Sequence, residues 1–154
     1  MISIHVDDQD ALALLKSVYA NRLNATSRGA RYSMNTRKRR FMEAFRASAR
    51  VEGEPVEGPL CVALFHFCLP RCDWDAGIKS TQDAVEIYLA CRNDRVIKSA
   101  FTFLTRPVKG TKKRQGRKAF VHVELYSMET ELDDALERAR DMGEWSRSCW
   151  QSKS

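Results

Sequence analysis

Residues 60–105, LCVALFHFCLPRCDWDAGIKSTQDAVEIYLACRNDRVIKSAFTFLT, decide the fold of this chain. They open with an almost unbroken apolar run of strand length, which predicts a central strand covered on both faces and ended by Pro70. Apolar residues at helical spacing then predict a helix from about Asp75 to residue 92. A polar turn leads into a second apolar strand at residues 95–105. The stretch therefore predicts a strand, a helix and a strand around one core.

The residues before this stretch predict one strand and two helices. Residues 2–6 alternate between apolar and polar, as in a short strand, and residues 7–23 show helical spacing behind an acidic start. A second helix is expected at about residues 35–49, with an apolar stripe of Phe41, Met42 and Phe45. Residues 51–59 contain Gly and Pro and predict a turn.

The residues after it predict a hairpin and a terminal helix. Residues 119–126 alternate like the second arm of a hairpin that residues 95–105 begin, with a long basic tip between the arms. A final helix is predicted by a stripe of apolar residues, namely Met128, Leu132, Ala135, Ala139 and Met142. We expect residues 146–154 to fray. The prediction is one α+β domain over residues 1–154, with about four strands flanked by helices.

Composition narrows the class of protein. The chain has 154 residues, 44% of them apolar and 30% charged, which is typical of a globular domain. No apolar run reaches the ~20 residues that a membrane span needs, and the start carries acids where a secretory signal has bases. The five cysteines are odd in number, which favours reduced thiols. We therefore expect a cytoplasmic protein that does not enter a membrane.

Basic charge is segregated along the sequence. Residues 22–50 contain nine Lys or Arg and one acid, and residues 106–118 contain seven and none, whereas residues 124–144 hold eight acids and two arginines. Such segregation is typical of a surface that binds a polyanion, although each block could also be a solvated face. The residues expected to contact the phosphates of such a polyanion are Arg37, Lys38, Arg39, Arg40, Lys109, Lys112, Lys113, Arg114, Arg117 and Lys118.

Asp73, Asp75, Lys79 and Asp94 are the candidate catalytic residues. The first two Asp flank Trp74 at the predicted strand-to-helix junction, and a bend there would let both carboxylates face one ion. Lys79 follows one helical turn after Asp75, and Asp94 begins the next strand. We expect the four groups to converge at one edge of the sheet. Clustered carboxylates without His or Cys ligands favour Mg²⁺, with phosphodiester hydrolysis as the chemistry.

Each of these residues also has a purely structural interpretation. Asp75 can be a helix cap, Asp94 a turn residue, and Lys79 an ion-pair partner of Asp75 or Asp83. Trp74 can belong to the core or stack on an unpaired base. A zinc site of His66, Cys68 and Cys72 is less favoured, because no distant histidine or Cys-x-x-Cys pair completes a tetrahedral set in the sequence.

The segment CDWDAGIKSTQDAVEIYLACRNDRVI, residues 72–97, resembles the signature of RusA-type Holliday junction resolvases. It shares with them a D-x-D, a lysine, a helix, and a polar turn with a further Asp before an apolar strand; the resemblance covers about residues 60–125. It implies a homodimeric endonuclease that resolves four-way DNA junctions by paired nicks, with Mg²⁺, or Mn²⁺ in its place. The resemblance implies catalytic roles for Asp73, Asp75, Asp94 and Lys79, with the three Asp holding the metal.

This chain also departs from the family pattern. The family often has Asn directly after the second Asp, where this sequence has Ala76, and its Pro- and Asn-rich N-terminal loop is replaced by residues 7–23. The resemblance implies a bacterial or phage-encoded protein. Two alternatives remain open: a basic nucleic-acid-binding domain without cleavage, and a nuclease for other branched DNA.

Overall fold

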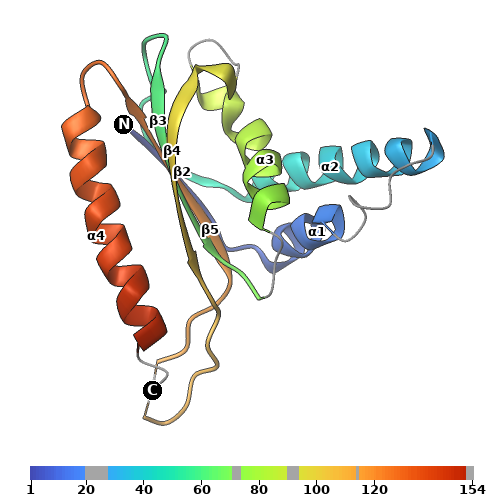
Figure 1. Cartoon of the computed structure of the whole chain (residues 1–154). Coiled ribbons are helices and arrows are strands. Elements are labelled where there is room, and N and C mark those ends of the chain that lie inside the picture. Colours follow the sequence, from blue (N-terminus) through green and yellow to red (C-terminus); the bar gives the residue numbers. More distant parts are fainter. Residues whose placement is uncertain (20–27, 71–73, 90–93, 114, 152–154) are drawn as a thin grey trace.

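The computed structural model describes residues 1–19, 28–70, 74–89, 94–113 and 115–151, which form a single α+β domain (Figure 1). At its centre is a five-stranded mixed sheet with the strand order β2-β1-β5-β3-β4. The predicted α+β class is confirmed, with one strand more than expected.

The strands come from distant parts of the sequence. They are β1 (Ile2–Val6), β2 (Arg50–Gly53), β3 (Cys61–Cys68), β4 (Ile97–Thr105) and β5 (Phe120–Ser127). β1 pairs antiparallel with β2 and with β5, and β5 pairs antiparallel with β3. β3 and β4 are parallel. A parallel pair needs a crossover connection, which α3 (Trp74–Val85) provides.

Helices cover both faces of the sheet. α1 (Gln9–Tyr19), α2 (Arg28–Ser48) and α3 lie on one face, and α4 (Leu132–Gln151) lies on the other (Figure 1). Two short 3₁₀ helices, η1 (Glu86–Tyr88) and η2 (Asp94–Val96), connect α3 to β4. Within the described part of the chain, no helix has the length and apolarity that crossing a membrane requires.

β3 is the buried centre of the domain. All eight of its residues are buried, and since successive residues in a strand point to opposite faces, both faces must be covered. Phe65 and Phe67 pack in the core under α1 to α3, together with Phe41 and Phe45 of α2, whereas Val62 and Leu64 pack against α4. The prediction of a central strand at residues 60–69 is confirmed.

The predicted hairpin between residues 95–105 and 119–126 is wrong. Both segments are strands, β4 and β5, but β3 lies between them in the sheet. The connection 106–119 therefore crosses the carboxyl end of β3. Strand alternation identifies a strand but carries no information about its neighbour, so the sequence pattern suggested the shortest connection instead.

Four further features differ from prediction. α2 begins at Arg28 rather than near residue 35, and β2 occupies part of the predicted turn at residues 51–59. Leu132 is 38% exposed at the start of α4, so the buried stripe consists of Ala135, Ala139 and Met142 and continues to Ser146. Residues 146–151, expected to fray, are helical, and the Trp150 indole Nε1 donates a hydrogen bond to the Leu104 carbonyl at 3.0 Å.

Candidate functional site

The Asp-x-Asp segment follows the carboxyl end of β3. Asp73 lies outside the described residues, and Asp75 is the second residue of α3. The first turn of a helix is a favourable place for a carboxylate, because the unpaired backbone N–H groups give it partial positive charge. This position is also near the carboxyl end of a buried strand of a parallel pair, where α/β proteins commonly bind ligands.

Asp94 lies at the opposite end of the same strand pair. It begins η2, directly before β4. β3 and β4 are parallel, with Cys61 opposite Ile97, a register shift between Cys61 and Val62, and Cys68 opposite Thr105, so the start of β4 lies beside the start of β3. α3, with 12 residues, spans about 18 Å between the two ends. Asp75 and Asp94, which we expected to converge at one edge of the sheet, therefore lie at opposite ends of it within one chain, and Asp73 is outside the described residues.

Lys79 pairs with a carboxylate of its own helix. Its Nζ lies 3.2 Å from Oδ1 of Asp83, one helical turn away, and its side chain is 52% exposed. Lys38 of α2 forms an ion pair with the other carboxylate oxygen of Asp83. The ion pair with Asp83 is the purely structural interpretation that the sequence offered for Lys79. About half of the Lys79 side chain remains accessible, so its ammonium group can also contact a phosphate.

The basic connection between β4 and β5 lies at the Asp-x-Asp end of the sheet. Val108 and Arg117 exchange two backbone hydrogen bonds of 2.8 Å, which hold the two arms of the connection together. Pro70, which follows β3, lines an open hollow of about 720 Å³ together with Lys109, Arg117 and Lys118. The topology thus places basic residues beside Pro70, which precedes Asp73 by three residues in the sequence.

The other predicted phosphate contacts fall into separate groups. Lys112 and Lys113 are exposed at the tip of the connection, and Arg114 lies outside the described residues. On α2, Arg39 and Arg40 are exposed, while Lys38 is paired with Asp83. Figure 1 shows α2 extending away from the sheet and the connection at the end of the sheet, so the two basic blocks do not form one patch in a single chain.

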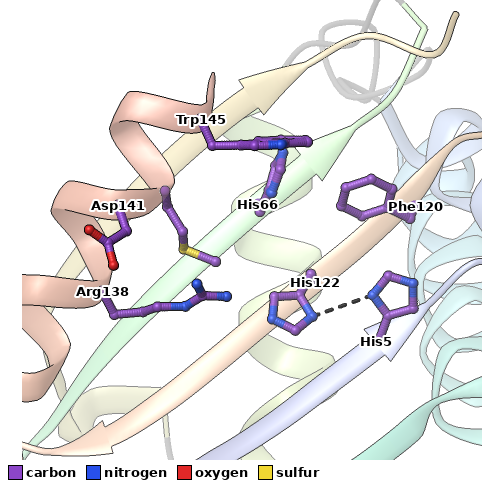
Figure 2. A pocket seen from close by; sticks show the side chains of 8 residues that line it. His5, His66, Phe120, His122, Arg138, Asp141 and Trp145 are labelled. Atoms are coloured by element: carbon purple, nitrogen blue, oxygen red, sulfur yellow. Dashed lines mark hydrogen bonds between the residues drawn. The ribbon is translucent and has the colours of Figure 1, made fainter. Parts of the chain in front are cut away.

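Sequence analysis missed a row of histidines on the sheet face under α4. The chain has three histidines, and the strand registers place His5 of β1 opposite His122 of β5, and His122 opposite His66 of β3. Directly opposed residues point to the same face. Figure 2 shows the three rings together, with the Nδ1 atoms of His5 and His122 3.4 Å apart.

Glu124 anchors this row. Its side chain is 5% exposed and accepts hydrogen bonds from His122 Nε2 at 2.9 Å, from the Tyr126 hydroxyl at 2.7 Å and from the Arg138 guanidinium. Burial alone would raise the pKa of Glu124, but the hydrogen bonds from His122, Arg138 and Tyr126 outweigh it and hold that pKa at about 2. Glu124 is therefore an ionised carboxylate at neutral pH.

His66 is the most buried of the three rings. It lies edge-on to Phe120 and to Trp145, each with ring centroids 4.9 Å away, and its Nε2 is 3.1 Å from the Thr105 hydroxyl. Burial lowers the pKa of His66 to about 4, and the neighbouring His122 and Arg117 act in the same direction. Burial also lowers the pKa of His5, helped by His122 and Arg50. Both rings are neutral at physiological pH.

The row opens into a cavity of about 530 Å³ between the sheet and α4. Its walls carry imidazoles, aromatic rings, the Arg138 guanidinium and the Asp141 carboxylate. Among the described residues, no three His, Cys, Asp or Glu side chains are already placed to share one metal ion. The only sequence signal for this cluster was that each histidine lies in a predicted strand, since the register that aligns the three strands cannot be read from the local sequence.

No protein-family model, curated protein or solved structure matches this chain.

Proposed function

We propose that the protein is a metal-dependent endonuclease of the RusA type that nicks four-way DNA junctions. The observation that carries this proposal is the crossing of the basic connection between β4 and β5 over the carboxyl end of β3, the strand that the Asp-x-Asp segment follows in the sequence. A nuclease needs cations to hold the phosphate backbone next to carboxylates that hold the metal. Lys109 and Lys118 supply such cations in the hollow beside Pro70, which precedes the Asp-x-Asp segment in the sequence.

A single chain does not fit a metal held by all three Asp, because Asp94 lies at the far end of β3 and β4. The proposal therefore includes a second copy of the chain. β4 is an edge strand with a run of exposed residues from Lys98 to Phe101, and an exposed edge of nine residues is a template for pairing with another strand.

Antiparallel pairing of β4 with β4 of a second copy would bring the missing carboxylate to the site. A two-fold axis near Phe101 would set the start of one β4 beside the end of the other. The start of β4 in one copy, Ile97, would then lie about 10 Å, two strand spacings, from the end of β3 in the other copy. Asp94 precedes Ile97 by three residues, and the Asp-x-Asp segment follows that end of β3, so both carboxylate segments would approach the same end of the joined sheet. The arrangement gives two equivalent sites, as paired nicking of a junction requires.

The chemistry that Mg²⁺ or Mn²⁺ would supply there is neutralisation of the scissile phosphate and activation of water. The side chains of this chain would position that phosphate, with Lys79 at the first turns of α3 and the basic connection above it.

The test is nicking of a synthetic four-way junction, with Mg²⁺ and with EDTA. Asp75→Asn and Asp94→Asn should each abolish nicking while junction binding stays intact, because the amide keeps the shape and removes the charge. Asp133→Asn, at an exposed position of α4, is the matched control and should cut normally. Full nicking by Asp75→Asn would refute the proposed site, and junction binding by wild type without nicking would favour the non-catalytic alternative.

Mixing the two inactive variants tests the shared site. In a mixed dimer of Asp75→Asn and Asp94→Asn, one site receives both substitutions and the other receives none. Half of the dimers are mixed, so about a quarter of the wild-type sites should be active. If each chain held a complete site, the mixture would stay inactive. Phe101→Glu, which places charge on the β4 edge, should abolish the rescue and yield monomers in sedimentation.

A further inference from the structure

We propose that His5 and His122 bind a divalent transition-metal ion such as Zn²⁺ or Ni²⁺ on the sheet face under α4, with His66 as a third ligand. This inference does not rest on the proposed nuclease function, since the row lies on the opposite face of the sheet from α3. It uses the only histidines of the chain.

The spacing of the two rings fits a shared ion. The Nδ1 atoms of His5 and His122 are 3.4 Å apart, which is long for a hydrogen bond between the two rings. Two imidazole nitrogens that each lie 2.0–2.1 Å from a tetrahedral Zn²⁺ are about 3.4 Å apart, because the angle between them is near 109°. The pair therefore stands at the separation of two ligands on one ion.

The hydrogen bond to Glu124 sets the tautomer that ligation needs. Because Glu124 is ionised, His122 must donate its Nε2–H to it across the 2.9 Å contact. In the neutral ring, the lone pair is then on Nδ1, aimed at His5. A carboxylate that accepts the remote N–H of a histidine is the usual outer partner of a metal-binding imidazole, and Arg138 and Tyr126 hold this one in place.

His66 can complete the set by rotation of its side chain. It is the direct cross-strand neighbour of His122, so their Cβ atoms lie about 5 Å apart. Its ring is neutral and therefore able to ligate. The cavity of about 530 Å³ gives room for the movement and for a water as fourth ligand. Nitrogen ligands select Zn²⁺, Ni²⁺ and Cu²⁺ rather than Mg²⁺.

The alternative to a metal ion between the two rings is a hydrogen bond. In that case His5 carries a hydrogen on Nδ1 and donates it to Nδ1 of His122. Titration with metal separates the two cases. Untagged protein, stripped with EDTA and dialysed, is titrated with Zn²⁺ and Ni²⁺ by calorimetry at pH 7.5, and Co²⁺ is added to record the visible absorption of a tetrahedral complex.

We expect one Zn²⁺ per chain, a rise in melting temperature on addition of Zn²⁺, and tetrahedral Co²⁺ absorption. His122→Gln should weaken Zn²⁺ binding at least 100-fold, and Glu124→Gln should weaken it 10- to 100-fold, the usual loss for an outer partner. The substitutions of His122 and Glu124 are at more buried positions and could unfold the protein. His5→Gln then keeps the test valid, because the His5 side chain is 30% exposed and its replacement should leave the fold intact.

Cys149→Ser is the control for binding through a thiol and should retain wild-type affinity. Excess Mg²⁺ should not compete. Absence of Zn²⁺ binding to the wild type, or wild-type affinity in a folded His5→Gln, would overturn the proposal and leave a shared proton between the rings.

Discussion

Lowering the pH should destabilise the fold through His66, by an amount that follows from its burial. The ring is buried, and its pKa falls from an ordinary value of 6.5 to about 4 in the folded protein. Between these two values the unfolded chain binds a proton that the folded chain does not, so stability is complete above pH 6.5 and declines as the pH falls. The loss is about 2 kcal/mol by pH 5 and about 3 kcal/mol by pH 4.

The perturbation that isolates this contribution is His66→Gln, which removes the titrating group and keeps an amide that can reach the Thr105 hydroxyl. Glu124 does not contribute in this window, because its folded pKa of about 2 lies below the ordinary 4.5 and its stabilisation is lost only as the pH falls below 4.5. His5 acts in the same direction in both proteins, so the comparison cancels it.

Urea unfolding at pH 8, 7, 6 and 5, in EDTA so that no metal binds the histidine row, measures the difference. The unfolding free energy of wild type should fall between pH 8 and pH 5 by about 2 kcal/mol more than that of His66→Gln, a large part of the 5–15 kcal/mol typical of a domain. Parallel curves for the two proteins across this range would show that His66 has the same pKa in the folded and the unfolded protein and that the argument from burial is wrong.

Three further predictions concern α4 and the basic connection. Met142→Asp should lower the free energy of unfolding by about 3 kcal/mol or more, because it buries an unpaired charge under α4. Leu132→Asp, at an exposed position, should change it by less than about 0.5 kcal/mol in urea unfolding. Equal losses in the two variants would contradict the observed burial. Lys112→Ala with Lys113→Ala should lower junction affinity and flatten its salt dependence by up to about one slope unit per lost phosphate contact, whereas the matched pair Arg140→Ala and Arg147→Ala on α4 should not. Arg117→Lys should weaken junction binding in gel shifts although the charge is kept, because lysine cannot reproduce the two hydrogen bonds that the guanidinium donates to the Arg106 carbonyl; unchanged binding would reduce Arg117 to a simple charge.

The elements that sequence analysis predicted well are those whose signal is local. The apolar run of β3 shows that both faces are covered, and Phe41 and Phe45 recur at helical spacing on the buried side of α2. The strand order is not local. β5 pairs with β3 and β1, which lie far away in the sequence, and its alternation is equally compatible with a hairpin to β4. The same limit hid the histidine row, which exists only once three distant strands are in register.

The error in strand order has a consequence for the proposed nuclease site. A β4–β5 hairpin would have placed its basic tip beyond an edge of the sheet, away from β3. Because β3 lies between the two strands, the connection must instead cross the carboxyl end of β3, where the Asp-x-Asp segment follows. The same parallel arrangement of β3 and β4 that brings the basic connection to the carboxyl end of β3 takes Asp94 to the other end. The parallel pairing of β3 and β4 thus places the basic connection at the proposed site within one chain, whereas Asp94 can reach that site only from a second chain.

The basic connection is also tied to the histidine row. Arg117 binds the Arg106 carbonyl, and its guanidinium lies 5.4 Å from the centroid of the Trp145 ring, which in turn packs edge-on against His66. A metal ion that turns His66 toward His122 would alter the packing under Trp145 and therefore the support of Arg117. The two proposals remain separable, because Zn²⁺ binding is measured without DNA and nicking by the variants is measured in Mg²⁺ alone. If both hold, Zn²⁺ should change junction affinity in the wild type and leave it unchanged in His122→Gln, since only the wild type can transmit the movement of His66 to the connection.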